Sequence, residues 1–330
     1  MGLSAILFAY MVVAQVIVLP LFSQNVENNF SAWEKELPQS IGELKEIQKQ
    51  MQSVLQRVRN TVVSVEAEDG AGSGVLISSD GLILTAAHVI GERGRKMQIV
   101  FPDGQKLEAL SLGGSEISDA GILKIIEPGE WEYAPMALAN NSKVGDWCFA
   151  LGHPSGFDAD RGLVLRVGRI IEKKEETLQT DCRLLGGDSG GPLFSVYGEV
   201  IGIHSRISQS PEDNFHTTVE SFISNWEYFL NEELHTFGDM QKGGFLGVSC
   251  KQAIDGLHIL AVVPNSPAMN ANLQPGDVLK RVDGMPLDTR EKLIILISSK
   301  PPGSLVAIDY LREENEISVQ ITLGERLVEE

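Results

Sequence analysis

Ser189 is the residue of this sequence best suited to covalent chemistry. It lies in the stretch Gly186-Gly187-Asp188-Ser189-Gly190-Gly191-Pro192-Leu193. A serine hydroxyl is a weak nucleophile unless a base removes its proton and N–H groups stabilise the oxyanion that forms. Glycines around the serine allow unusual backbone angles and keep side chains away from a substrate carbonyl. We expect Ser189 to be a nucleophile, with the N–H groups of Gly187 and Ser189 as oxyanion donors and that of Asp188 as a helper. The alternative is a tight glycine-rich turn that happens to contain a serine.

A histidine and an aspartate supply the rest of this chemistry. His88 follows the apolar run Leu82–Leu84. A general base must titrate near neutral pH and be held in one orientation, which a histidine at a strand end satisfies. Asp119 directly precedes another apolar run and, when buried, can accept a hydrogen bond from the imidazole. Glu116 is the nearest competitor, and we prefer Asp119 because it adjoins the strand. The order histidine, aspartate, serine is that of chymotrypsin-type enzymes.

The segment that must position these residues, 61–232, is rich in short apolar runs separated by turn signals. The runs are Val62–Val65, Gly74–Ile77, Leu82–Leu84, Met97–Phe101, Ile122–Ile126, Cys148–Leu151, Leu163–Ile171 and Val200–Ile203. Asp80-Gly81 and Asp103-Gly104 are typical of hairpin turns. This spacing predicts an all-β barrel or sandwich. A helix is expected at 221–235.

A second domain is predicted at 244–326, after a glycine-containing linker at 233–243. The expected strands and helix are Leu246–Val248, His258–Val263, Val306–Leu311, Ile317–Leu323 and the helix Thr289–Ser298.

The N-terminal residues 1–26 carry no charged side chain, and Leu3–Phe22 is almost wholly apolar. As a signal peptide, this segment lacks a basic residue near its start. As a membrane anchor, it has about the 20 residues that a bilayer requires. The anchor is slightly favoured, and both interpretations direct the chain to or across a membrane.

Residues 27–60 form an N-terminal helical segment in our interpretation. Apolar residues recur every three or four positions over 40–58, with Ser40 as N-cap and Glu43 as its capping-box partner. The helix either forms a short coiled coil between subunits or lies as an amphipathic helix on its own domain.

Composition excludes some functions. The net charge of -18 argues against a nucleic-acid partner, because phosphate binding requires clustered Lys and Arg.

The three cysteines Cys148, Cys182 and Cys250 show no metal-binding spacing, so we expect no metal and no cofactor. They are interpreted as buried thiols, with a Cys148–Cys182 bridge as the alternative. The remaining histidines are taken as structural, although His204 could border a substrate cleft.

The motifs together resemble the HtrA (Deg) family of serine proteases over residues 61–228. Besides the Ser189 loop, the matching stretches are Gly72-Ser73-Gly74, Thr85–Val89, Asp119–Lys124, Val144–Trp147, Leu151–Pro154, Gln179–Asp181 and Gly198–Ile203. The resemblance implies a mainly β fold with a double six-stranded, trypsin-like barrel. It also implies that His88, Asp119 and Ser189 form the catalytic triad.

The second domain resembles a PDZ domain, an α+β fold. Gly244–Val248 is similar to a carboxylate-binding loop and its following strand, and later motifs are Ser266-Pro267-Ala268, Leu273–Asp277 and Val282–Gly284. The resemblance implies that Phe245, Leu246, Gly247 and Val248 bind a peptide C-terminus. An exposed strand edge can indeed add an extended peptide. Two roles are open for Leu293, Leu296 and Ile297: they line the floor of the groove that would hold the peptide, or they pack in the core.

The resemblance implies an ATP-independent endopeptidase outside the cytoplasm, in the periplasm or tethered to the membrane through residues 3–22. Unfolded or regulatory proteins would be its substrates, and a homotrimer its assembly. One departure is Asp188, where the family usually has Asn, so we expect it to meet a Lys, an Arg or a backbone donor. Because of this and of the unusual Leu184-Leu185-Gly186, a chaperone or peptide-binding scaffold with low activity is the main alternative. An exported esterase is a third hypothesis.

Overall fold

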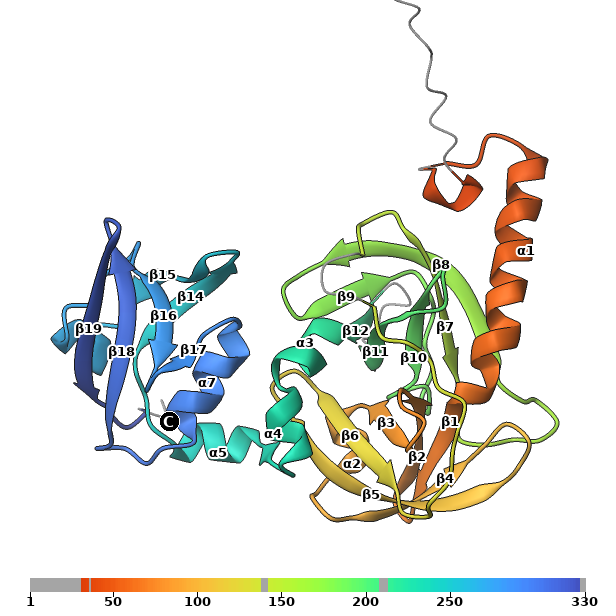
Figure 1. Ribbon diagram of the computed structural model, residues 1–330, viewed down its shortest axis with the longest axis horizontal. Helices are drawn as coiled ribbons and strands as arrows, with labels where there is room; N and C mark the ends of the chain where they lie inside the picture. Colours follow the sequence, from red (N-terminus) through yellow and green to blue (C-terminus); the bar gives the residue numbers. More distant parts are fainter. Residues whose placement is uncertain (1–30, 36, 138–141, 208–212, 327–330) are drawn as a thin grey trace, which may run out of the picture.

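The computed structural model describes residues 31–35, 37–137, 142–207 and 213–326 (Figure 1). The segment 1–26, with its signal-or-anchor alternatives, lies outside the described residues. Within the described part, no helix is both long enough and apolar enough to span a bilayer.

The first β-barrel surrounds one half of the catalytic chemistry. Its strands are β1 (Val62–Ala67), β2 (Gly70–Leu76), β3 (Leu82–Thr85), β4 (Lys96–Val100), β5 (Lys106–Ser115) and β6 (Ala120–Ile125). They run in the order β5-β4-β1-β2-β3-β6, and pairing of β5 with β6 closes the barrel. The two predicted hairpin turns are confirmed, since Gly81 and Gly104 adopt positive φ angles of 92° and 88° between paired strands.

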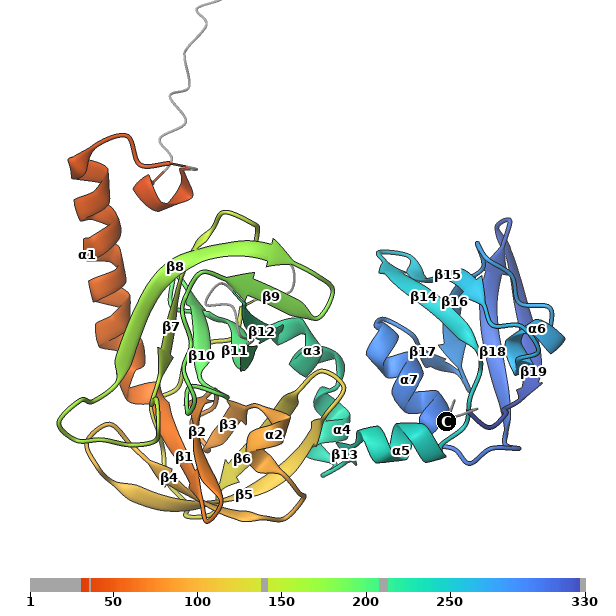
Figure 2. The same ribbon diagram turned by 180° about the vertical axis from the view of Figure 1, so that it is seen from behind.

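The second barrel carries the nucleophile loop. Its strands are β7 (Trp147–Gly152), β8 (Val164–Lys173), β9 (Thr177–Thr180), β10 (Pro192–Ser195), β11 (Val200–Ile207) and β12 (Asn214–Thr218). They close in the order β10-β11-β12-β9-β8-β7. The expected double six-stranded barrel is therefore confirmed, and Figure 2 shows the two barrels stacked against each other.

Helix α1 (Ile41–Val58) lies against the barrels of its own chain, after the short 3-10 helix η1 (Ala32–Glu34). Val54 and Val58 pack into the core, whereas Ile41 and Leu44 are exposed. The Ser40 hydroxyl accepts from the Glu43 N–H, as predicted. The Glu43 carboxylate, however, bonds to the N–H of residue 39 rather than to that of the N-cap.

The chain between the domains is more ordered than predicted. The helix expected at 221–235 is two short helices, α3 (Val219–Ser224) and α4 (Trp226–Leu230), separated by Asn225. The expected linker contains the strand β13 (Leu234–His235), which pairs with β5, and the helix α5 (Phe237–Lys242). A reciprocal capping box of Thr236 and Asp239 begins α5.

The second domain is a sheet in the order β14-β15-β16-β18-β19 with one long helix against it. The elements are β14 (Val248–Ala253), β15 (Gly256–Val262), α6 (Pro267–Asn270), β16 (Val278–Val282), β17 (Met285–Pro286), α7 (Arg290–Ser298), β18 (Leu305–Arg312) and β19 (Asn315–Thr322). The strand predicted at 246–248 instead begins at Val248.

The three cysteines are free and buried. Cys148 and Cys182 share the core of the second barrel, and no bridge joins them.

Candidate active site

His88 and Asp119 meet between the barrels. His88 lies on the short helix α2 (Ala87–Ile90), which directly follows β3. Asp119 ends the turn between β5 and β6, with a φ angle of 58°. The His88 Nδ1 lies 2.9 Å from Asp119 Oδ1 and 3.0 Å from Oδ2. The His88 backbone N–H also donates to Oδ1, at 3.1 Å.

Each member of this pair shifts the pKa of the other. The hydrogen bond to the Asp119 carboxylate raises the pKa of His88, despite the opposing effect of burial. Burial acts to raise the pKa of Asp119, but the bonds from His88 and Ser205 outweigh it and the pKa is lowered. Asp119 therefore stays ionised at neutral pH and can stabilise an imidazolium on His88.

Ser189 lies beside His88. Both residues line one cavity of about 160 Å³ together with residues of the first barrel. The Ser73 N–H donates to the Ser189 carbonyl at 2.7 Å, so β2 holds the nucleophile loop against the first barrel. No hydrogen bond joins the Ser189 and His88 side chains in the described part of the chain. Such bonds often tighten only when substrate binds.

The nucleophile loop has an unusual backbone conformation at Gly187. Gly187 adopts a φ angle of 94°, and a Cβ there would lie 2.2 Å from the Ser155 nitrogen, so only glycine fits. Among the described residues, the N–H groups of Gly187 and Ser189 have no protein acceptor. The Asp188 N–H differs from the expectation, because it donates to the Leu185 carbonyl at 3.0 Å and is not available as a third donor.

The Asp188 side chain meets an arginine, as expected, and a backbone donor as well. The Arg166 guanidinium contacts its two carboxylate oxygens at 2.8 and 3.1 Å. The Leu185 N–H donates to Oδ2 at 2.8 Å. Burial raises the pKa of Asp188, and these donors only partly offset that effect. Gly152 makes room for the carboxylate, since a Cβ there would lie 2.4 Å from Oδ1.

Ser205 is a site residue that sequence reasoning missed. Ser205 lies on strand β11, and its hydroxyl donates to Asp119 Oδ2 at 2.6 Å. The neighbouring Thr217 hydroxyl donates to the carbonyl of Ser118, which precedes Asp119. Neither residue carries a local signal, because each is an ordinary polar residue of a strand.

His204 supports the nucleophile loop through its backbone rather than its side chain. Its carbonyl accepts from the Gly190 N–H at 2.7 Å, and its N–H donates to Gly191 at 2.8 Å. The side chain is buried against His216, with 2.9 Å between the two Nδ1 atoms. Burial lowers the pKa of His216 to about 3, and burial beside His216 lowers that of His204 well below its ordinary value. This pair is therefore neutral and structural.

The predicted peptide-binding residues begin the sheet of the second domain. Phe245 exchanges two backbone hydrogen bonds of 2.9 Å with Gly324, whereas Leu246 is buried in the core. Gly247 adopts a φ angle of 89°, and Val248 opens strand β14. Within the described sheet, β14 pairs only with β15 and therefore has an open edge. Leu293, Leu296 and Ile297 of α7 all belong to the core cluster.

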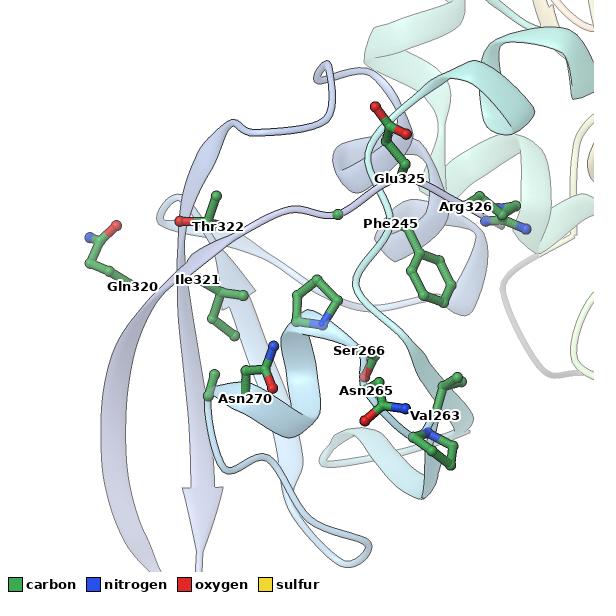
Figure 3. A pocket seen from close by; sticks show the side chains of 14 residues that line it. Phe245, Val263, Asn265, Ser266, Asn270, Gln320, Ile321, Thr322, Glu325 and Arg326 are labelled. Atoms are coloured by element: carbon green, nitrogen blue, oxygen red, sulfur yellow. The ribbon is translucent and has the colours of Figure 1, made fainter. Parts of the chain in front are cut away.

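A larger hollow than the one at His88 and Ser189 lies away from the triad. It measures about 1280 Å³ and lies on the second domain between Phe245, helix α6 and the end of β19 (Figure 3). Leu246, Gly247 and Val248 do not line it.

Comparisons with known proteins agree with this architecture. The family model "Trypsin-like peptidase domain" matches residues 72–203, and the model "PDZ domain" matches residues 244–323. The fold and the site therefore define a trypsin-like peptidase domain followed by a PDZ domain.

Two relatives of this chain are periplasmic serine endoproteases. The chain is 31% identical over 272 residues to the periplasmic pH-dependent serine endoprotease DegQ of Escherichia coli (strain K12), covering 77% of this chain and 59% of that protein. It is 28% identical over 269 residues to the periplasmic serine endoprotease DegP of the same strain, covering 76% and 56%. The chain thus spans less than two thirds of the length of these relatives.

Solved structures lead to the same family. A crystal structure of a serine endoprotease from Yersinia pestis is 26% identical, with a TM-score of 0.55, covering 84% of this chain and 98% of that one. The HtrA-type protease AlgW with tripeptide has a TM-score of 0.57 over 84% of this chain and 98% of that one; at 22% identity it supports the fold alone. The two family models, the relatives and the solved structure from Yersinia pestis together support an HtrA (Deg) serine protease.

Proposed function

We propose that this chain is an ATP-independent serine endopeptidase that cleaves misfolded or regulatory proteins. The observation that carries the proposal is that His88 lines one cavity together with Ser189, while its Nδ1 lies within hydrogen-bond distance of both carboxylate oxygens of Asp119. The endoprotease names of the relatives support it as well.

In the proposed first step, the Ser189 Oγ attacks the carbonyl carbon of the scissile bond while His88 Nε2 takes the hydroxyl proton. Asp119 holds the imidazole through Nδ1 and stabilises the resulting imidazolium. The N–H groups of Gly187 and Ser189 donate to the oxyanion. The intermediate then collapses to an acyl-enzyme as His88 gives its proton to the leaving amine. Water, activated by His88, hydrolyses the acyl-enzyme in the second half.

The second domain is proposed to bind peptide C-termini through Phe245, Leu246, Gly247 and Val248. The open edge of β14 supports this role, because an extended peptide can add there as a further strand. The Gln252 N–H, near the far end of β14, donates to the Glu175 carboxylate of the protease domain at 2.9 Å. A long peptide would have to displace that contact.

We further propose a location outside the cytoplasm, in keeping with the periplasmic names of the relatives. A homotrimer and attachment through residues 3–22 extend the family resemblance. The proposed domain bounds are 61–232 for the protease and 244–326 for the PDZ domain; the intervening 233–243, although partly helical, joins them.

The test is mass spectrometry of the products formed from unfolded casein by the wild-type chain and by Ser189→Ala. We expect defined peptides from the wild type and none from the variant, with equal melting temperatures. Ser53→Ala, a change at an exposed serine of α1, is the control and should cleave like the wild type. Equal cleavage by Ser189→Ala would contradict the assignment. An inactive wild type that still suppresses casein aggregation would favour the scaffold alternative.

A further inference from the structure

A buried ion pair joins the nucleophile loop to strand β8. Asp188 is 0% exposed, and the side chain of Arg166 is 14% exposed. The two guanidinium contacts, at 2.8 and 3.1 Å, give each carboxylate oxygen a charged donor. This two-pronged geometry is available to arginine and not to lysine.

The carboxylate needs this partner. A buried charge without a counter-charge is strongly unfavourable, and removal of one partner from a buried pair is among the costlier substitutions. Among the described residues, the only other donor to the carboxylate is the Leu185 N–H, at 2.8 Å. Apart from Arg166, the charged group that bears on Asp188 is the more remote Arg161.

Asp188 in turn fixes the loop on both sides of itself. Its N–H donates to the Leu185 carbonyl at 3.0 Å, and its own carbonyl accepts from the Gly191 N–H at 2.8 Å. With the bond from Leu185 N–H to the carboxylate, these contacts constrain the chain from residue 185 to residue 191. Gly187 and Ser189, the two proposed oxyanion donors, lie within this stretch.

The cation comes from a strand of the barrel. Arg166 lies on β8, opposite Ala150 of β7. Gly152, two residues along β7, leaves the space in which the Asp188 carboxylate sits. The pairing therefore depends on the folded barrel alone and requires no cleavage of the chain to create a new amino terminus. Because a guanidinium stays protonated at all ordinary pH values, the partner is permanently charged.

We infer that Arg166 is a positioning residue for catalysis, which holds the Gly187-Asp188-Ser189 loop in its oxyanion-binding shape through the Asp188 carboxylate. This inference rests on the proposed peptidase function. It predicts a loop that is competent without an activating cleavage.

The test is the rate at which a fluorophosphonate probe modifies Ser189 in a set of variants of the full chain. Arg166→Gln should slow modification about 100-fold, because the buried carboxylate loses its counter-charge and the loop rearranges. Arg166→Lys should lose about 10-fold, since an ammonium cannot contact both oxygens. For a peptide substrate, kcat should fall with KM little changed.

Rescue distinguishes positioning from simple folding damage. Asp188→Asn should lose at most about 5-fold, and the double variant Arg166→Gln/Asp188→Asn should react at least about 10-fold faster than Arg166→Gln, since it buries no unpaired charge. Arg169→Gln, on the same strand, is the control and should react at the wild-type rate. Melting temperatures show that each variant is folded.

The same measurements distinguish failure of the role of Arg166 from failure of the proposed peptidase function. Equal modification of the wild type and Arg166→Gln, or a double variant no faster than Arg166→Gln, would overturn the role of Arg166 alone. A folded wild type that the probe does not modify would contradict the proposed peptidase function itself.

Discussion

Two fully buried carboxylates in this chain are stabilised by different means. Asp188, which directly precedes the nucleophile, is 0% exposed and pairs with the guanidinium of Arg166. Glu291, in the first turn of α7, is 1% exposed and has uncharged partners: it accepts from the Ser115 hydroxyl and, at 2.7 Å, from Asn225 Nδ2. No ion pair involves Glu291 among the described residues.

The two carboxylates also differ in what they connect. Asp188 lies within the second barrel and holds the nucleophile loop. Glu291 belongs to the PDZ domain but bonds to protease residues, so it joins the two domains where α7 faces the protease (Figure 1). Its partner Ser115 ends β5, only four residues before Asp119.

The two carboxylates, Asp188 and Glu291, also differ in the charges around them. Burial raises the pKa of Glu291 to about 7, and the nearby Glu176 adds to the effect. Burial raises the pKa of Glu176 too, although the charge of Arg290, the neighbour of Glu291 on α7, opposes that rise. The nucleophile loop therefore has a permanent charge partner, whereas the contact between the domains contains a carboxyl group whose pKa lies near neutral pH.

The largest expected difference is in stability. Arg166→Gln should lower the free energy of unfolding by about 3–5 kcal/mol, because it leaves a buried carboxylate without its cation. Ser115→Ala removes one uncharged donor from Glu291 and should cost about 1–2 kcal/mol. Denaturant unfolding of both variants measures the difference. Equal costs would mean that the two carboxylates do not differ in the way we describe.

Glu291→Gln tests the titrating carboxylate. In the folded protein Glu291 keeps its proton up to about pH 7, whereas in the unfolded chain it loses the proton near its ordinary value of 4.5. The folded state binds more protons between these values, so its stability falls as the pH rises through this window. One pKa unit is worth about 1.4 kcal/mol, which gives a loss of about 3 kcal/mol.

The Gln variant should lack this loss, so its stability relative to the wild type should improve from pH 4.5 to pH 8. Urea unfolding across that range measures it. Glu46→Gln, at an exposed position of α1, is the control and should keep the wild-type pH dependence. A Glu291→Gln profile parallel to the wild type would show that Glu291 ionises normally in the fold.

The sequence allowed the site to be predicted better than its supports. His88, Asp119 and Ser189 each lie in a motif with a local chemical reason, and the fold brings them together. Their supports come from distant strands. Arg166 lies 22 residues before Asp188, and Ser205 lies 86 residues after Asp119. Neither has a local pattern that identifies its partner.

The secondary structure shows the same contrast between elements that have a local sequence pattern and elements that lack one. Strands with β-branched runs, such as β1 and β11, were predicted from their apolar residues. The apolar pattern does not reveal strand β12, because it contains Asn214, His216 and two threonines. These side chains are buried through hydrogen bonds to other segments, such as the 2.8 Å bond between His216 and Thr180, rather than in apolar contacts. Helix α5 lies in the predicted linker and has no apolar pattern to reveal it, because it buries no residue and its clearest helix signal is the capping box at its start.

Peptide mapping of the wild-type chain after reaction with a fluorophosphonate tests most directly whether Ser189 is an activated nucleophile. We expect one adduct, on Ser189, formed without prior cleavage of the chain or addition of a peptide. His88→Ala should abolish its rapid formation, because the serine then has no base. An adduct on a different serine, or no adduct on the intact folded chain, would show that Ser189 is not the nucleophile of a preformed site.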